Sequence, residues 1–429
     1  MLAAINFTHI MDFMIMMPLG NYLMPHFNIT AQQFSLLVAA YTFSAAIASL
    51  SAAPIVDRFD RKKMLMFAYI GFLLGTLCCA VAPSYELLLV SRIVAGLFGG
   101  LIGAQVLSIV ADIVPFERRG TAMGIIMAAF SVASVFGVPF GLYLSKYISW
   151  HAPFYFIAAT GALLIPLLLK YIPNMRDYIN KEPINGAVIL RMVFPLILVW
   201  EIIKEKNERL GILLISTMMM GHFLIVPFLN PFLEFNMGFT NTQTPMVYLV
   251  GGTLTLFTSP LIGKLADKLG KFKLFSYMVL LAVIPIALIT NMPDIPFYLV
   301  LCITGFWFVV STGRAIPAQA IVSEIVPPAR RGSFMNISSS IQQMAVGLAS
   351  LGAGLIVVKT PQNTIENYDI TGYISMAIIL SCLLIGYRLN LALSKRTKHV
   401  HAADSPMQAA AIQPMTMLKD AEEEDIIKR

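Results

Sequence analysis

One loop signature occurs twice in this chain, about half a chain apart. Residues 57–63 read Asp-Arg-Phe-Asp-Arg-Lys-Lys and follow one apolar segment, and residues 267–273 read Asp-Lys-Leu-Gly-Lys-Phe-Lys and follow another. These two copies are offset by 210 positions (267 − 57). A second acid-to-basic stretch, residues 112–120, recurs as residues 324–332 with an offset of 212 (324 − 112). A duplication of this length predicts two structurally similar halves.

The chain is apolar enough to cross a membrane many times. Of its 429 residues, 58% are hydrophobic and 12% are charged, and the mean hydropathy is +0.77. Typical soluble domains carry roughly a quarter charged residues. Apolar stretches of about 20 to 30 residues can cross a hydrocarbon core of roughly 30 Å as helices. Twelve such stretches occur, at residues 2–24, 34–56, 64–82, 86–112, 121–148, 153–172, 210–235, 245–265, 274–291, 296–325, 333–358 and 373–393. The sequence therefore predicts an all-α fold of twelve transmembrane helices, six in each half.

The positions of lysine and arginine predict the orientation of the chain. Of the 30 basic residues, 26 lie in or beside the even-numbered connections and the C-terminal tail, whereas Lys146 and Lys359 lie on the odd-numbered side. Loops rich in these residues tend to stay cytoplasmic, so we expect both termini in the cytoplasm and the chain in the plasma membrane. This asymmetry accounts for the net charge of +7 without a nucleic-acid partner.

The spans also divide the chain into segments. The first six define a half at residues 1–172, and the last six define a half at residues 210–393. Residues 173–209 contain a short, interrupted apolar piece and are predicted to be a cytoplasmic linker on the inner membrane surface, in contact with lipid. Residues 394–429 are polar and are predicted to be a cytoplasmic tail.

The duplicated loops resemble a signature of the major facilitator superfamily. In that family the loop between spans two and three reads Gly-x-x-x-Asp-Arg-x-Gly-Arg-Arg/Lys. Residues 53–62 match this pattern except that Ala53 and Asp60 replace the glycines, whereas residues 263–271 keep both glycines. The resemblance covers nearly the whole chain. It implies the major facilitator fold with two pseudo-symmetric halves, a monomer, a small-molecule substrate, and no cofactor or metal.

By the same resemblance, the charged loops form a latch that holds one arrangement of the two halves. Acids at helix ends and basic residues about one turn away can form such a network. Simple positive-inside anchoring requires only lysine and arginine, so the matching acids favour the latch. The residues implied are Asp57, Arg58, Arg61, Asp112 and Arg119 in the first half, and Asp267, Lys271, Glu324 and Arg331 in the second.

Asp12 and Arg92 are the candidates for proton coupling. Asp12 is the only carboxylate in the middle of any predicted span, and residues 92–96 resemble the arginine motif of proton-coupled family members. Burial raises a carboxylate's pKa and a nearby arginine lowers it, so an aspartate that alternates between these surroundings can carry a proton. We expect Asp12 to be that carrier, with Arg92 or Arg314 as its partner. The alternatives are a permanent structural ion pair for Asp12 and snorkelling for Arg92.

Three small or rigid residues of the fifth span resemble the antiporter motif of the family's efflux members. They are Gly137, Pro139 and Gly141. Proline removes a backbone hydrogen bond, and glycines four residues apart permit close helix contact. The alternative is ordinary packing of small residues.

Aromatic and amide side chains within other spans are candidates for the wall of a substrate cavity. Few charges accompany them, which suits amphipathic or cationic organic molecules. The candidates are Tyr41, His222, Asn230, Trp307, Arg314, Gln319 and Gln342.

The sequence lacks the motifs that nucleotide-driven pumps and membrane enzymes require. It contains no Gly-x-x-x-x-Gly-Lys-Ser/Thr loop for a nucleotide, and no His-Glu-x-x-His or Gly-x-Ser-x-Gly for an enzyme. We therefore expect a secondary transporter and not an enzyme, most simply one that exports its substrate in exchange for protons by alternating access. The alternative is a facilitator or proton symporter for a sugar or small metabolite. A non-transporting receptor or scaffold is a more remote alternative.

Overall fold

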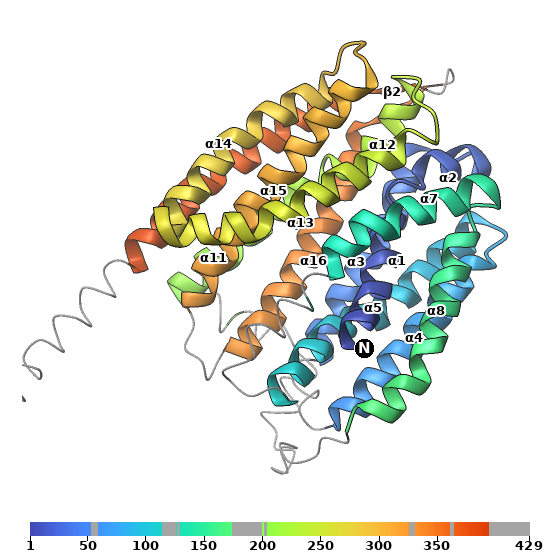
Figure 1. Cartoon of the computed structure of the whole chain (residues 1–429), viewed down its shortest axis with the longest axis horizontal. Helices are drawn as coiled ribbons and strands as arrows, with labels where there is room; N and C mark the ends of the chain where they lie inside the picture. The colour runs from blue at the N-terminus through green and yellow to red at the C-terminus, as the bar shows by residue number, and fades with distance from the viewer. Residues whose placement is uncertain are drawn as a thin grey trace, which may run out of the picture.

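The computed structural model describes residues 1–52, 59–113, 126, 129–173, 200, 204–325, 331–360 and 364–393. Nearly all of this part is helical, and long helices lie side by side in it (Figure 1). Residues 174–199 and 201–203 of the predicted linker lie outside the described residues, and α11 begins within its last part, at Lys206. The predicted tail lies wholly outside the described residues.

The first half is built from six spans. Its described elements are α1 (Leu2–Ile15), α2 (Gly20–Phe27), α3 (Ala31–Ala52), α4 (Arg61–Ala80), α5 (Tyr85–Ile113), the π-helix η2 (Ala133–Gly137), α7 (Val138–Tyr147) and α8 (Ala152–Tyr171). Together α1 and α2 form the first span, and η2 and α7 belong to the fifth.

The second half repeats this plan. Its described helices are α11 (Lys206–Phe223), α12 (Val226–Phe235), α13 (Thr244–Leu269), α14 (Lys271–Thr290), α15 (Phe297–Ile325), α16 (Arg331–Ile356) and a last helix, Tyr368–Leu393. Between α16 and the last helix, β1 (Val358–Lys359) and β2 (Ile365–Glu366) pair antiparallel, with Val358 opposite Glu366.

The predicted twelve-helix fold is confirmed. Ten described helices are long and apolar enough to cross a membrane, or eleven when α1 and α2 count as one bent span. The remaining predicted span is α16, which has 26 residues but is interrupted by the polar stretches 338–340 and 342–343. Its polar side chains need not face lipid, because α16 packs against α3 and α11.

Proline explains why two of the spans are broken. α1 and α2 are separated by residues 16–19 and differ in direction by 53°. Pro18 lies in this break, and proline both lacks an N–H and disfavours helical geometry in the preceding residue. In the second half, residues 224–225 separate α11 from α12, and Pro227 lies in the first turn of α12, where proline is tolerated.

The two halves approach closely where small residues line the helices. α3 of the first half packs along α16 of the second, and η2 and α7 pack against α13. A Cβ atom at Gly354 of α16 would overlap the side chain of Ser35 on α3, and one at Gly252 of α13 would lie 2.8 Å from the Val135 side chain of η2. Without side chains at these glycines, the helix backbones can come close enough for dispersion contacts to hold the halves together.

Polar contacts join the halves at the end of the molecule that carries α2, α12 and β2 (Figure 1). The side chain of Asn230 on α12 donates hydrogen bonds to the Pro18 carbonyl at 3.0 Å and to Asn21 Oδ1 at 3.2 Å. Asn21 in turn donates to Glu234 of α12, which also accepts a bond of 2.5 Å from Thr244. These contacts close this end, which the predicted orientation places on the outer side of the membrane.

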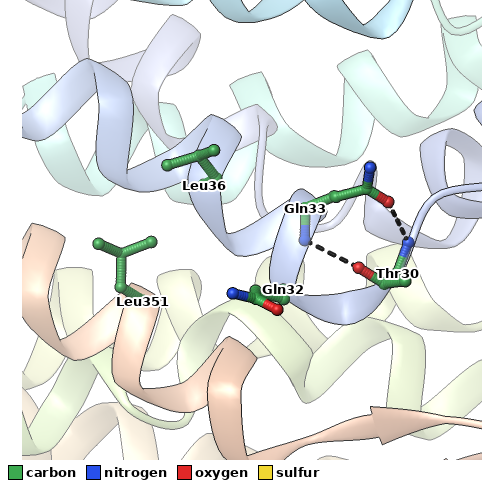
Figure 2. A pocket seen from close by; sticks show the side chains of 5 residues that line it. All are labelled: Thr30, Gln32, Gln33, Leu36 and Leu351. Carbon is green, nitrogen blue, oxygen red and sulfur yellow. Dashed lines mark hydrogen bonds between the residues drawn. The ribbon is translucent and has the colours of Figure 1, made fainter.

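A cavity of about 430 Å³ lies between the start of α3 and α16 at the same end (Figure 2). Thr30 and Gln33 both line it, but each also caps α3. The Thr30 N–H donates to Gln33 Oε1 at 2.9 Å, and the Gln33 N–H donates to Thr30 Oγ1 at 3.1 Å. This reciprocal pair is a capping box, so two of the polar side chains that line this cavity already stabilise the start of α3.

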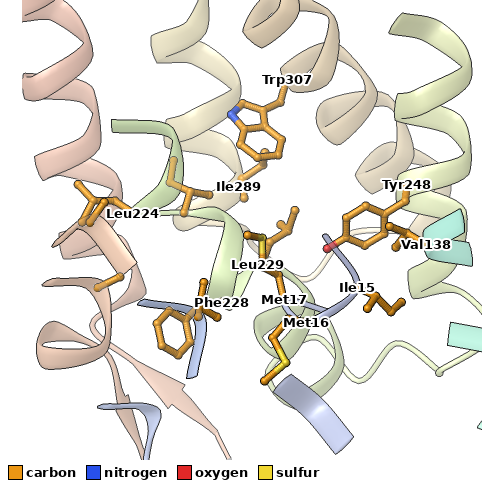
Figure 3. Close-up of a cluster of buried hydrophobic side chains, with 14 of the residues drawn as sticks. Ile15, Met16, Met17, Val138, Leu224, Phe228, Leu229, Tyr248, Ile289 and Trp307 are labelled. Atoms are coloured by element: carbon orange, nitrogen blue, oxygen red, sulfur yellow. The ribbon is translucent and has the colours of Figure 1, made fainter. Parts of the chain in front are cut away.

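The largest apolar core contains residues from both halves. Figure 3 shows Ile15, the last residue of α1, and Met17, from the break between α1 and α2, in one cluster with Leu229 of α12 and Tyr248 of α13. Val138, at the start of α7, lies beside Tyr248 in the same view. The core therefore continues across the boundary between the halves at this level of the bundle.

Candidate functional site

Asp12 of α1 and Arg92 of α5 form a buried ion pair. Arg92 Nη1 donates to Asp12 Oδ2 at 2.8 Å, and both side chains have an exposed fraction of 0%. The other carboxylate oxygen accepts a bond of 3.2 Å from the Thr76 hydroxyl of α4. Of the two arginines expected as partners for Asp12, the structure brings Arg92 to it. Three helices of the first half thus meet at one carboxylate.

Tyr41 of α3 completes the surroundings of this pair. The Arg92 guanidinium carbon lies 4.3 Å from the centre of the Tyr41 ring, a cation–π arrangement. Glycines of α5 permit this approach, because a Cβ atom at Gly96 would overlap Ser44 and the Tyr41 backbone, and one at Gly99 would overlap the Tyr41 hydroxyl. Gly96, the glycine of the motif at residues 92–96, therefore allows α5 to pack closely against α3.

His9 was not assigned a role from the sequence, yet its ring lies in the same cluster. Its ring centre is 6.4 Å from that of Tyr41 and 5.7 Å from that of Phe72. Neither ring nitrogen has a hydrogen-bond partner among the described residues. The available signal was its spacing, because His9 lies three residues before Asp12 and residues three apart share a helix face.

Three of the predicted cavity residues form a second cluster in the other half. Arg314 Nη2 of α15 lies 3.3 Å from His222 Nδ1 of α11. The His222 ring stacks on Trp307 of α15, with ring centres 4.8 Å apart and planes inclined by 20°. Arg314 is 1% exposed, and Trp307 is 2% exposed. In the described part of the chain, no carboxylate forms an ion pair with Arg314.

The internal repeat relates the two clusters. His222 lies 210 positions after Asp12 (222 − 12), the offset that separates the duplicated acids 57 and 267. The first half therefore has a carboxylate where the second half has an imidazole. Each of these side chains contacts a buried arginine from another helix of its own half.

Aromatic rings connect the two clusters across the boundary between the halves. Phe13 lies next to Asp12 in the sequence, and its ring centre is 5.7 Å from that of Tyr41. It is also 5.9 Å from the ring centre of Phe223 on α11, which follows His222. A continuous series of ring contacts thus runs from the Asp12–Arg92 pair to the Arg314 cluster.

The antiporter-like motif packs against the helix that carries Asp12. A Cβ atom at Gly137 would lie 3.2 Å from Met11, and one at Gly141 would lie 2.6 Å from Ile15. Pro139 is in the first turn of α7, directly after the π-helix η2. π-Helical turns are rare and are frequent at functional sites.

The other predicted cavity residues lie elsewhere. Asn230 belongs to the polar contacts that close the α2–α12 end. Gln342 is bonded within α16, where its amide donates to Ser338 Oγ at 3.2 Å. Gln319 is an exposed residue of α15. Glu234, which lies close to the boundary between the halves, was missed, although the four-residue spacing from Asn230 places both on one face of α12.

The latch residues fall only partly within the described residues. Asp57, Arg58 and Arg119 lie outside them, and the side chains of Asp112, Glu324 and Arg331 are likewise not described. Arg61 and Lys271 begin α4 and α14, and Asp267 is an exposed residue near the end of α13. The latch stays a prediction.

One departure from the family's loop pattern has a structural explanation. Asp60 replaces a glycine of that pattern and is the N-cap of α4. Its Oδ1 atom accepts a bond of 2.9 Å from the Lys62 N–H. An N-cap aspartate satisfies a backbone donor that would otherwise lack a partner.

Comparison with known proteins agrees with the fold and the motifs. The family model described as Major Facilitator Superfamily matches residues 2–350. "Uncharacterized MFS-type transporter YceJ" of Bacillus subtilis (strain 168) is 26% identical over 377 residues, which cover 87% of this chain and 91% of that protein. "Probable sugar efflux transporter" of Helicobacter pylori (strain P12) is 23% identical over 332 residues, which cover 77% of this chain and 81% of that protein.

A solved structure shares the same architecture. It is that of a bacterial homologue of the human lysosomal transporter Spinster, in an inward-facing and unoccupied conformation. It superposes with a TM-score of 0.71 over 92% of this chain and 96% of that chain, at 16% identity. From the twelve helices, the duplicated loops and the match over most of its length, the chain belongs to the Major Facilitator Superfamily.

Proposed function

We propose that this transporter exports small amphipathic organic molecules in exchange for protons, by alternating access. Family membership makes the chain a multi-pass membrane transporter and not an enzyme. The observation that carries the proposal is the fully buried pair of Asp12 and Arg92. In this proposal the protein works as a monomer in the plasma membrane with both termini in the cytoplasm, so that the α2–α12 end faces outward.

Protonation of Asp12 would strongly destabilise the conformation in which Asp12 and Arg92 are paired. While Asp12 is charged, the pair is neutral overall and Thr76 satisfies the second carboxylate oxygen. A proton on Asp12 would leave the Arg92 charge uncompensated at a buried position, which costs several kcal/mol. The protonated protein would then favour a conformation in which Arg92 reaches water or another partner. Proton binding of this kind shifts the balance between two conformations.

The packing offers a route from this pair to the boundary between the halves. α1 carries Asp12, and η2 and α7 lie against α1 at Gly137 and Gly141. η2 in turn contacts α13 of the second half at Gly252. A displacement of α1 therefore meets a close-packed element that also touches the other half. Close packing of this kind transmits small shifts because it leaves little space to absorb them.

Export is the direction favoured by the antiporter-like motif and by the name of the Helicobacter pylori relative, a probable sugar efflux transporter. That name also supports the alternative substrate, a sugar. In a symporter, substrate and protons would move in the same direction, and in a facilitator the substrate would move without protons. The direction of proton flow that accompanies substrate flow separates these three functions.

The test uses purified protein in liposomes that contain a pH-sensitive dye. Candidate amphipathic compounds are added under an imposed pH gradient, and proton and substrate fluxes are followed together. We expect opposite fluxes in the wild type and no substrate-dependent proton flux in Asp12→Asn. Asp294→Asn is the matched control, because Asp294 is an exposed acid between α14 and α15. Equal proton fluxes in the wild type and Asp12→Asn would refute the proton-carrier role.

A further inference from the structure

We infer that Arg314, together with His222 and Trp307, binds an acidic group of the transported molecule, so that the substrates are amphipathic carboxylic acids. The inference deepens the proposed function, on which it rests only for the statement that the bound molecule is transported. It begins from a buried cation that has no counter-charge among the described residues.

Arg314 lacks the partners that a buried guanidinium usually has. Its side chain is 1% exposed, and its Nη1 atom has no hydrogen-bond partner among the described residues. Its one described polar contact is the 3.3 Å approach of Nη2 to His222, a neutral or cationic group but never an anion. Buried charges in proteins are generally paired, and charges inside membrane spans mark substrate or ion paths.

Arg92 provides a comparison within the same molecule. It is equally buried and lies in the corresponding helix of the first half, but Asp12 supplies its counter-charge at 2.8 Å. At the repeat-related position the second half has His222, which cannot compensate Arg314. The first half therefore contains its own anion, whereas the second half is complete only when an anion from outside the described structure joins it.

The atoms around Arg314 suit a carboxylate in particular. A guanidinium presents N–H donors in a planar fork that matches both oxygens of a carboxylate. Because Arg314 donates to His222 Nδ1, the neutral ring carries its proton on Nε2, which provides a further donor. His222 is only partly buried, and it is the most exposed of the three side chains.

The rest of the surroundings suits an apolar body attached to that carboxylate. The Trp307 ring stacks with His222, and the ring centre of Phe223 lies 5.4 Å from that of His222 in an edge contact. Phe13 extends this aromatic surface into the first half. An amphipathic acid would place its rings or chain along these side chains, whereas a cationic substrate would be repelled by Arg314. The inference thus selects acids from the broader class of amphipathic molecules.

The experiment compares three probes that share one ring system and differ in the attached group. 1-Naphthylacetate is anionic, 1-naphthylacetamide is neutral, and 1-naphthylmethylammonium is cationic. Equilibrium binding of each to the full-length protein is measured by calorimetry in nanodiscs of zwitterionic lipid, without a pH gradient. The variants are Arg314→Gln, Arg314→Lys and His222→Gln. Arg388→Gln is the matched control, because Arg388 is an exposed arginine of the last helix.

We expect the wild type to bind the carboxylate about tenfold or more tightly than the other two probes, as a charge-assisted hydrogen bond provides. Arg314→Gln should lose this preference, Arg314→Lys should retain part of it, and Arg388→Gln should bind like the wild type. Equal affinity of the wild type for all three probes, or no carboxylate binding at millimolar concentration, would overturn the inference. The wild-type comparison needs no variant, so it decides even if Arg314→Gln does not fold.

Two further measurements distinguish a free acid from a lipid headgroup as the bound anion, and distinguish failure of the acid site from failure of the proposed proton exchange. Repeating the titration with anionic phospholipid in the nanodisc tests a lipid headgroup as the occupant, and loss of carboxylate binding there would overturn the assignment to a free acid. Carboxylate binding without substrate-coupled proton flux in liposomes would refute proton exchange while leaving the acid site intact.

Discussion

Phe13 and Phe223 are related by the internal repeat and touch one another. They are 210 positions apart (223 − 13), and their ring centres are separated by 5.9 Å. In a two-fold arrangement, equivalent residues contact each other only close to the symmetry axis. This ring pair therefore lies close to the pseudo-symmetry axis between the halves. The residue before each ring, Asp12 in the first half and His222 in the second, contacts a buried arginine of its own half.

The ring contact between Phe13 and Phe223 should contribute to stability as a pair. Truncation of either ring to alanine should lower the free energy of unfolding, and the double variant should lose less than the sum of the two by about 0.5–1.5 kcal/mol, as for other aromatic pairs. Denaturant titration of the three variants in detergent measures this coupling. Strict additivity would show that the two rings do not interact.

The ion pair should behave as a unit when its members are neutralised. Asp12→Asn leaves Arg92 without a counter-charge, and Arg92→Gln leaves Asp12 without one, so each change should destabilise the protein by about 3–5 kcal/mol. The double variant removes both charges and should recover part of this loss. Thermal unfolding in detergent ranks the two single variants and the double variant by Tm. A double variant that is less stable than both single variants would contradict the prediction.

Close contact between α3 and α16 should depend on the glycine at position 354. A Cβ atom there would overlap the Ser35 side chain and lie 3.0 Å from the Ala31 carbonyl oxygen. We expect Gly354→Ala to cost about 1–3 kcal/mol through overpacking and to slow transport, because the halves meet at this point. The measurements are Tm and the initial transport rate.

The control for that substitution is Gly103→Ala in α5, where no described residue lies within 4 Å of the added atom. Alanine is favoured over glycine by up to about 1 kcal/mol within a helix, so this variant should be as stable as the wild type or more stable. If both variants had the same effect, helix propensity and not the contact with Ser35 would explain the result.

The stability of the protein should decrease as the pH is lowered, because His151 gains a proton less readily in the folded chain. His151 lies just before α8 and outside the spans. Burial lowers the pKa of His151 below its ordinary value of 6.5, the hydrogen bond to the Ala80 carbonyl opposes this, and His26 adds to it. The folded chain therefore binds fewer protons than the unfolded chain just below pH 6.5. Stability from this group is complete above pH 6.5 and decreases as the pH falls towards the pKa of the folded state.

The measurement for His151 is the Tm between pH 7 and pH 5. We expect the wild type to lose more stability over this range than His151→Gln, since glutamine has no charge to gain. His26→Gln is a useful comparison, because His26 is exposed and 6.5 Å from the His151 ring. Parallel curves for the wild type and His151→Gln would show that other groups cause the decrease.

Much of the fold could be predicted because a bilayer sets the length of its helices. Each of the twelve predicted spans corresponds to a helix or to a broken pair of helices. The breaks were harder to predict. Pro18 and Pro260 are both within predicted spans, yet α13 continues through Pro260 whereas the first span breaks at Pro18. Local sequence does not show which proline is accommodated by its neighbours.

The site was predictable in part. Asp12 and Arg92 stood out because charges are rare within spans, and Arg314 stood out for the same reason. His9 and Thr76 did not, since α1 and α4, which carry them, are apolar around most of their circumference and show little periodicity to mark an inward face. Hence the sequence grouped Asn230 and Gln342 with the cavity residues but did not identify Thr76, His9 or Glu234. Their positions depend on how helices far apart in sequence pack.

The break at Pro18 leaves a backbone carbonyl oxygen of the first half available for a contact with the second half. In a continuous helix the carbonyl of residue 18 would accept from the N–H of residue 22, but Tyr22 donates to Leu19 instead. The Pro18 oxygen is thereby available to Asn230 of the other half. Closure of this end thus relies on a backbone atom that no side-chain replacement can delete. In a straightened first helix the same oxygen would accept from the Tyr22 N–H, so the break at Pro18 leaves an acceptor of the first half without a helical bond and presents it to the second half.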